Sequence, residues 1–146
     1  PGGVLRAIGG WLSDKLGFEV RLPKEWEWER AARGTEGRVH PWGDENTEGR
    51  ANISFNIGRT SAVGIYPQGA SAEGVMDLSG NVWEWCLNEY WKPERTQRGG
   101  RQARVLRGGS WDFGPESSRA GYRDVANPNV RSFSVGFRVV SLSPIR

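Results

Sequence analysis

Few side chains in this sequence could carry out acid–base or nucleophilic chemistry. The chain has one histidine, His40, and one cysteine, Cys86, and the two stand in unrelated stretches of sequence. A serine-type triad would have to use His40 as its base, because there is no second histidine. The carboxylates of Glu25, Glu27 and Glu29 recur within one short segment, which is typical of the solvated face of a helix. We therefore predict no catalytic residues, and we interpret His40 as a polar loop residue.

The composition indicates a single small domain with a core of large side chains. The chain has 146 residues, of which 36% are hydrophobic, 8 are tryptophan and 21 are glycine. A buried aromatic side chain removes roughly 150–250 Å² from water, so a few tryptophans can supply much of a core. One cysteine excludes an internal disulfide, and no apolar run is long enough to span a membrane. The start at Pro1 predicts that the chain is the C-terminal part of a longer protein. Its location stays open between the cytoplasm and, through upstream segments, the cell surface.

The positive charge of the chain is concentrated in its last third, but it is not clustered. Residues 104–146 carry seven basic and three acidic side chains, and the whole chain has a net charge of +3. Nucleic-acid-binding domains usually gather their lysines and arginines into a stripe. Here the arginines stand singly between other residues: Arg104, Arg107, Arg119, Arg123, Arg131 and Arg138. We therefore expect no nucleic-acid partner.

The elements that must position any functional residue are two helices and several short strands. Apolar residues spaced by three and four predict a helix over 4–16, ended by Gly17. A second helix begins after Pro23 and ends before Gly34. The stretch 34–81 is rich in Gly, Asn, Asp and Ser, which predicts long irregular connections. Short strands are predicted at 18–22, 104–107 and 135–140. This order of elements predicts an α+β domain.

A series of short motifs runs through the chain. They are RLPKEWEWERAARG at 21–34, PWGDE at 41–45, ANI at 51–53, GNVWEW at 80–85, RGGSW at 107–111 and GFR at 136–138. Together these motifs resemble the formylglycine-generating-enzyme (sulfatase-modifying factor) superfamily, and the resemblance covers roughly residues 5–140. It implies one domain over 1–146 with a C-type-lectin-like α+β fold, which has two N-terminal helices, short antiparallel strands and much irregular structure.

The resemblance also bears on catalysis. Formylglycine-generating enzymes share two copper-binding cysteines shortly after the GGS element, and copper(I) prefers such soft thiolate ligands. In this chain no cysteine follows Trp111, and Cys86 comes directly after the motif at 80–85 instead. The resemblance therefore implies a domain without this oxidase activity. Two alternatives stay open, namely an oxidative relative of the formylglycine-generating or sulfoxide-synthase type with an upstream catalytic part, and a static interaction domain.

One segment, residues 104–138, resembles the variable region of a narrower group. Its spaced arginines and closing GFR follow the pattern of the variable proteins of diversity-generating retroelements, in which a reverse transcriptase copies a template with errors at adenines. Thirteen positions are thereby implied to be diversified and to bind ligand, and each residue is reachable from an asparagine codon by changing adenines alone. These positions are Asp112, Phe113, Gly114, Ser117, Tyr122, Asp124, Val125, Ala126, Asn127, Val130, Ser132, Phe133 and Ser134.

This second resemblance implies a ligand-binding module and not an enzyme. The implied positions combine aromatic residues with small polar ones, as antibody binding loops do, and the ligand would be a protein or another macromolecule. The arginines between them can hold loops by donating hydrogen bonds to backbone carbonyls. In the alternative interpretation, Phe113 and Phe133 are core residues of a static domain.

One further pair of residues could bind a metal ion. The resemblance implies a calcium loop at 80–84, where Asn81 and Glu84 would supply two of the six to eight oxygen ligands that calcium takes. In the alternative interpretation, both side chains make turn and loop hydrogen bonds without a metal. Trp83 and Trp85 alternate at strand spacing and are predicted to be core residues. The predicted binding function requires no cofactor, with Ca²⁺ as an option.

Overall fold

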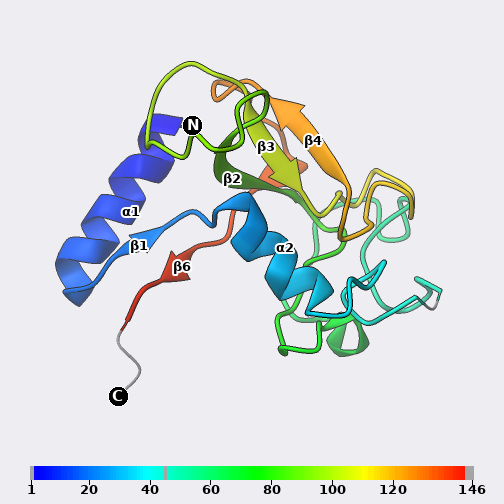
Figure 1. Ribbon diagram of the computed structural model, residues 1–146. Helices are drawn as coiled ribbons and strands as arrows, with labels where there is room; N and C mark the ends of the chain where they lie inside the picture. Colours follow the sequence, from blue (N-terminus) through cyan, green and yellow to red (C-terminus); the bar gives the residue numbers. More distant parts are fainter. Residues whose placement is uncertain (1, 45, 144–146) are drawn as a thin grey trace.

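The computed structural model describes residues 2–44 and 46–143 and places two helices beside two small sheets (Figure 1). The helices are α1 (Gly2–Leu16) and α2 (Glu25–Arg33), and a short 3-10 turn, η1, spans Pro67–Gly69. The strands are β1 (Val20–Arg21), β2 (Trp83–Glu89), β3 (Arg104–Arg107), β4 (Arg123–Ala126), β5 (Val135–Gly136) and β6 (Val140–Ser141). Both predicted helices and the α+β class are confirmed. Within the described residues, none of the helices has the length and apolar character needed to cross a membrane.

Helix α1 lies at the edge of the molecule against a two-stranded sheet (Figure 1). In that sheet β1 and β6 run antiparallel, so the C-terminal strand returns to the start of the chain. Ser13 joins the helix to β1, because its hydroxyl accepts the Val20 N–H at 2.8 Å and donates to the Gly9 carbonyl at 2.7 Å. Gly9 permits this approach, since a Cβ there would lie 3.1 Å from the Val20 carbonyl oxygen.

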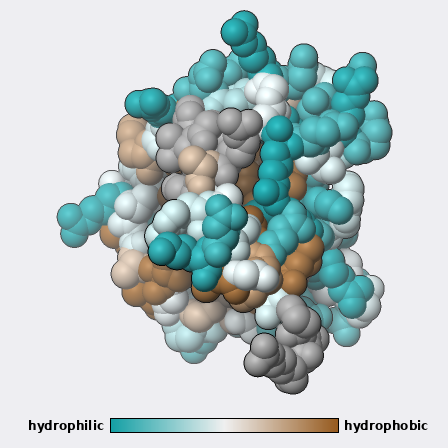
Figure 2. Space-filling model, turned by 90° about the vertical axis from the view of Figure 1, so that its left-hand side faces the viewer, coloured by the Kyte–Doolittle hydropathy of each residue, from teal (hydrophilic) through white to brown (hydrophobic). Residues whose placement is uncertain are grey.

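Seen from the α1 side, the surface is largely hydrophilic, with hydrophobic side chains in a band between polar ones (Figure 2). Two large apolar side chains of α1, Trp11 and Leu16, are exposed. Singly exposed apolar residues are common on folded proteins, so they do not by themselves mark a binding site.

Helix α2 lies across the four-stranded sheet and supplies part of the core. Lys24 caps its N-terminus, where the Lys24 backbone N–H donates to the Glu27 carboxylate at 2.8 Å, and Gly34, with a φ of 62°, caps its C-terminus. Trp28 and Ala32 lie four positions apart, so they share one face of the helix, and both are buried. They pack in one cluster with Cys86 of β2 and Val105 of β3.

The larger sheet has the strand order β4-β3-β2-β5 and a hydrophobic cluster on each face. Successive side chains of a strand point to opposite faces, so Cys86 faces α2 while Trp83 and Trp85 face away from it. These two tryptophans cluster with Leu106 of β3. Both are buried, which confirms their predicted place in the core.

The strands differ from the prediction in three respects. The single strand predicted over 135–140 is two strands, and β5 pairs parallel with β2 while β6 joins β1. The strand predicted over 18–22 is shorter, and β4 was not predicted at all. The irregular stretch 34–81 is confirmed, because η1 and two isolated bridges are its only regular structure among the described residues.

Candidate ligand-binding surface

Four arginines of the last third are tied to the scaffold, namely Arg104, Arg107, Arg123 and Arg138, and Arg107 on β3 is the most deeply buried of them. Its side chain is 1% exposed. It donates to the Glu25 carboxylate at 3.1 Å and to the Glu29 carboxylate at 2.8 Å. It also donates to the backbone carbonyls of Ala120 at 2.7 Å and Gly121 at 3.4 Å. Arg107 thus connects α2 to the loop that precedes β4.

Arg123 on β4 shares the Glu25 carboxylate with Arg107. Its Nε and Nη2 atoms lie 2.7 and 2.9 Å from the two carboxylate oxygens, and its guanidinium stacks over Tyr90 at 4.6 Å. The hydrogen bonds to Glu25 raise the pKa of Arg123. The interpretation of Glu25, Glu27 and Glu29 as a solvated face is therefore wrong, because Glu25 is buried between two arginines and both other carboxylates are also ion-paired.

Arg138, which follows β5, anchors the other end of the segment. Its Nε lies 2.6 Å from one Glu84 carboxylate oxygen, and its Nη2 lies 2.8 Å from the other. The same Nη2 also donates to the carbonyls of Met76 and Asp77. Trp28 of α2 donates its indole N–H to Glu84 at 2.6 Å. Glu84 is therefore the buried counter-ion that joins α2, β2 and the chain after β5.

Arg104 at the start of β3 is a buried cation that carbonyl oxygens surround. It donates to the carbonyls of Leu87, Gln97 and Gly99. Burial lowers the pKa of Arg104. With Arg107 and Arg138, it confirms the expectation that these arginines hold loops by their backbone carbonyls.

The residues considered for calcium have other partners in the structure. Asn81 accepts the Ser61 N–H at 2.9 Å through Oδ1, whereas Glu84 faces Trp28 and Arg138. The two side chains thus have different protein partners in this structure, and the calcium site stays a prediction. This arrangement matches the alternative interpretation, in which they make loop hydrogen bonds. No group of three acidic, histidine or cysteine side chains with metal-binding geometry occurs in residues 2–44 and 46–143.

The thirteen implied ligand-binding positions lie mostly at the surface. Eight of them are exposed, namely Phe113, Gly114, Tyr122, Val125, Asn127, Val130, Ser132 and Phe133. Four others are partly buried, namely Asp112, Ser117, Asp124 and Ala126. Ser134 differs, because it is buried and its carbonyl accepts the Trp83 N–H at 2.8 Å. Ser134 thus joins the strand ladder in this structure and does not point outward.

Three aromatic residues of this set rest on buried or half-buried tryptophans. Phe113 packs edge-on against Trp83 with ring centroids 5.4 Å apart, and Tyr122 packs against the same indole at 5.9 Å. Phe133 packs against Trp111 at 5.8 Å. Their exposed fractions are 42%, 43% and 75%. The rings therefore form an outer layer over the tryptophans and are not core residues, contrary to the alternative interpretation.

A fourth exposed ring, Phe55, belongs to this layer although no sequence pattern singled it out. It packs edge-on against Trp111 with centroids 5.3 Å apart, and its backbone N–H donates to the Trp111 carbonyl at 2.8 Å. We call the exposed rings of Phe55, Phe113, Tyr122 and Phe133 the aromatic surface. The contacts that join Phe55 to it are long-range, so local periodicity carries no signal for them.

The residues that resemble catalytic groups lie elsewhere. Cys86 is buried under α2, and burial raises the pKa of its thiol. His40 is also buried, and its ring stacks on Trp42 with centroids 4.9 Å apart. Burial lowers the pKa of His40, so the imidazole stays neutral near pH 7. His40 is thus a packed residue, not the polar loop residue that the sequence suggested.

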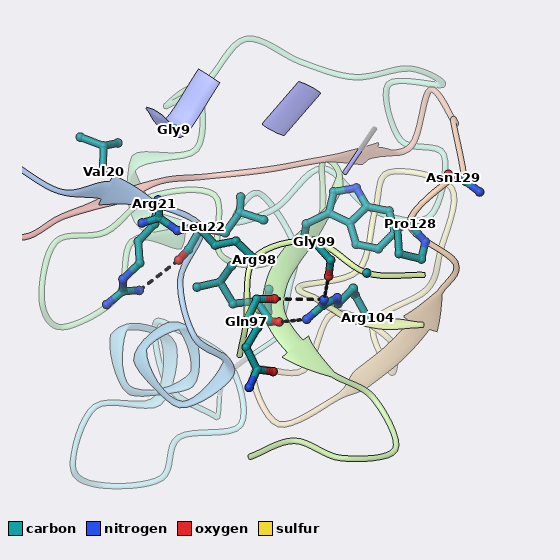
Figure 3. Close-up of a pocket in the computed structure, with 14 residues that line it drawn as sticks. Gly9, Val20, Arg21, Leu22, Gln97, Arg98, Gly99, Arg104, Pro128 and Asn129 are labelled. Atoms are coloured by element: carbon teal, nitrogen blue, oxygen red, sulfur yellow. Dashed lines mark hydrogen bonds between the residues drawn. The ribbon is translucent and has the colours of Figure 1, made fainter. Parts of the chain in front are cut away.

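A cavity lies at a different place, next to β1 and the middle of β2 (Figure 3). It has a volume of about 310 Å³, and its wall includes Trp85, Arg104 and the loop at 97–100. In Figure 3 the Arg104 guanidinium turns toward the carbonyls of Gln97 and Gly99, so its donors are already engaged. Asn129 reaches its rim, but none of the thirteen positions lines it.

The sequence of the chain matches a protein family and individual proteins of known name. The sulfatase-modifying factor enzyme 1-like domain matches residues 7–142. The chain is 38% identical over 140 residues to hercynine oxygenase of Mycobacterium tuberculosis, covering 82% of this chain and 32% of that protein. It is 35% identical over 145 residues to the inactive C-alpha-formylglycine-generating enzyme 2 of Mus musculus, covering 83% and 42%.

The fold of the chain is also similar to that of a solved protein structure. The fold is similar to that of Treponema denticola variable protein 1, with a TM-score of 0.72 and 30% identity, covering 84% of this chain and 47% of that one. The chain thus spans less than half the length of these three proteins. They include a protein named as an oxygenase, one named as inactive and one named as variable.

Proposed function

The chain belongs to the sulfatase-modifying factor enzyme 1-like domain family, and on that basis we propose that it is a ligand-binding domain of the variable-protein type. Its ligand is a protein or another macromolecule, bound by the segment 112–134 together with the aromatic surface. The scaffold below this segment stays constant, while the outward side chains vary.

The observation that supports the proposal most strongly is the separation of the structure into a buried scaffold and an exposed layer of side chains above it. Arg107, Arg123 and Arg138 hold the backbone from within through ion pairs with the buried carboxylates of Glu25 and Glu84. Most of the thirteen positions are exposed above them. Surface substitutions usually change the free energy of unfolding by only about 0.5 kcal/mol in either direction, so such positions can vary without loss of the fold.

The aromatic surface also has the character of a protein-binding site. Phe113, Tyr122 and Phe133 stand among serine, asparagine, aspartate and glycine. Rigid rings contribute contact area at a low cost in conformational entropy, while small polar neighbours adapt to different partners. Rings of this kind are also the usual energetic centres of protein interfaces.

An oxidase function fits this chain less well. The two cysteines of that reaction are missing from the segment after Trp111, and Cys86 has a buried thiol with a raised pKa. A reactive thiol needs exposure and a lowered pKa. The binding function that we propose requires no cofactor.

The similarity to hercynine oxygenase supports one alternative, in which the whole protein is an oxidative enzyme with catalytic residues outside this chain. Metal analysis and an oxygenation assay on the full-length protein distinguish this alternative from the proposal. Oxygen-dependent turnover of hercynine would favour the alternative, and its absence would favour a binding domain.

A display library tests whether this surface can bind protein ligands. The thirteen positions are randomised to the residues that an adenine-mutated asparagine codon encodes, and the library is selected against purified lysozyme. A control library randomises the same number of exposed positions on α1 and in the loop 91–102. We expect folded, specific lysozyme binders from the first library alone. If it yields no more binders than the control, the proposed function is wrong.

Population sequencing tests the proposed diversification in the source cells. Codons 104–138 and the flanking DNA are sequenced from many cells. We expect substitutions at the thirteen positions that match the adenines of a nearby, nearly identical repeat. One invariant sequence without such a repeat would instead support a static interaction domain.

A further inference from the structure

The segment that carries Phe55 has an unusual backbone. Ser54 and Phe55 both lie in the left-handed region, with φ of 55° and 59°. This conformation is uncommon for residues other than glycine, and for a bulky side chain it is a steric outlier. Such strain persists only where the surrounding structure enforces it, and it concentrates at functional sites.

Hydrogen bonds to the variable segment enforce this conformation. The N–H groups of Ser54 and Phe55 donate to the carbonyls of Phe113 and Trp111, each at 2.8 Å. The next residue closes the turn, because the Asn56 N–H donates to the Ile53 carbonyl at 3.0 Å and its side chain donates to the Ala51 carbonyl at 3.1 Å. The strained turn is thus fastened directly to the backbone of residues 111–113.

The strain is not explained by burial of the side chain. The Phe55 ring is 62% exposed, and its described ring contact is the edge of Trp111. A residue that only had to complete this turn could be glycine, which adopts positive φ without strain. The position instead holds a large apolar ring at the surface, where it adds little to folding.

The Phe55 ring lies beside residues of the proposed binding surface. Trp111 contacts Phe55 on one side and Phe133 on another, so the three rings are contiguous. Phe133 is among the thirteen variable positions, whereas Phe55 lies far outside the segment 104–138. A ligand that touches Phe133 or Phe113 therefore comes within reach of a residue that does not vary with them.

We propose that Phe55 is a fixed anchor of the binding surface, which contacts an exposed aliphatic or aromatic side chain of a protein ligand. This inference rests on the proposed function and deepens it. The variable residues would select the partner, while Phe55, supported by Trp111, supplies an apolar contact common to all partners. Aromatic anchors surrounded by polar contacts are typical of protein–protein interfaces.

Independent lysozyme binders from the randomised library test this inference, because they share Phe55 but differ at the thirteen positions. Phe55→Ala is introduced into at least five of them, and the Kd for lysozyme is measured for each. We expect a weakening of about tenfold or more in most clones. The matched control is Trp91→Ala, which removes a ring that is 77% exposed and lies beyond the far end of β2. We expect the control to change Kd by less than about twofold.

A second variant keeps the test independent of folding. Phe55→Gly suits the φ of 59°, so we expect it to keep the melting temperature of the parent while weakening binding as much as Phe55→Ala does. If binders are obtained but both variants change the Kd by less than about twofold from that of the parent binder, the proposed role of Phe55 is wrong and the proposed function stands. If no binders are obtained, the proposed function fails and the anchor fails with it.

Discussion

Replacement of Arg107 by methionine tests the idea that this buried arginine holds the segment 112–134 on the scaffold. Methionine keeps much of the length and apolar volume of the side chain but removes its charge and its donors. The change breaks two ion pairs, with Glu25 and Glu29, and leaves the carbonyls of Ala120 and Gly121 without this donor. It also removes the contact of the guanidinium with the Trp28 ring, 5.2 Å away.

The expected loss of stability is large because the site is 1% exposed. Removal of one partner of a buried ion pair typically costs about 3–5 kcal/mol, since a charge is left behind without compensation. Glu25 keeps Arg123 as a partner, which favours the lower end of that range. Domains are stable by about 5–15 kcal/mol, so the variant should fold but only marginally. A loss of this size lowers the melting temperature by roughly 6–20 °C in a domain of this length.

Urea unfolding followed by tryptophan fluorescence measures the loss. The control is Arg119→Met, which breaks the ion pair with Glu116, where the side chains are 52% and 75% exposed. Exposed pairs contribute about 1 kcal/mol or less, so the control should unfold nearly as the parent does. If Arg107→Met loses less than about 1 kcal/mol, or no more than the control, the argument that Arg107 holds this segment is refuted.

Three further predictions concern the aromatic surface and the two residues that resemble catalytic groups. Simultaneous replacement of Phe113, Tyr122 and Phe133 by alanine should leave a cooperatively folded domain with a melting temperature only a few degrees lower. Trp83→Ala, in contrast, should cost about 3–5 kcal/mol of unfolding free energy. A calorimetric scan without a transition in the triple variant would show that the three rings are core. Because burial lowers the pKa of His40, its neutral form stabilises the fold above the unfolded pKa of about 6.5, and this contribution is lost as the pH falls toward the lower folded pKa. Urea midpoints at pH 7.5 and 5.5 should therefore differ more in the parent than in His40→Gln, and equal differences would contradict this role. The Cys86 thiol should react with N-ethylmaleimide only after unfolding, as measured by mass spectrometry, and rapid modification of the folded domain at pH 8 would contradict its burial.

The sequence predicted the helices well because their determinants are local. Trp28 and Ala32 recur at helical spacing, and Gly34 follows the last turn. Trp83 and Trp85 likewise showed the alternation of a buried strand. The family followed from motifs that span nearly the whole chain, and the match over residues 7–142 confirms it. The similarity to a solved structure with a TM-score of 0.72 confirms the fold class.

The environment of each glutamate could not be predicted, because it depends on distant residues. Glu25 is buried by Arg107 and Arg123, which lie 82 and 98 positions further along the chain. Local spacing described only the helix that carries Glu25. The same holds for β4, which has no alternating apolar pattern and forms because β3 pairs with it. Phe55 was missed for a related reason, since its backbone conformation is imposed by residues 111–113.

The arrangement around β2 has a consequence for the length of the connection between β3 and β5. β2 pairs with β3 on one side and with β5 on the other. Neighbouring strands lie about 4.8 Å apart, so the chain leaves β3 and returns in β5 only about 10 Å away. The connection contains β4, so loop-closure entropy applies to its exposed part after that strand, residues 129–133. Doubling the length of such a loop adds only about 0.6 kcal/mol. Insertions within residues 129–133 should therefore be tolerated almost as readily as substitutions there, and related chains would then differ in the reach of this loop as well as in its chemistry.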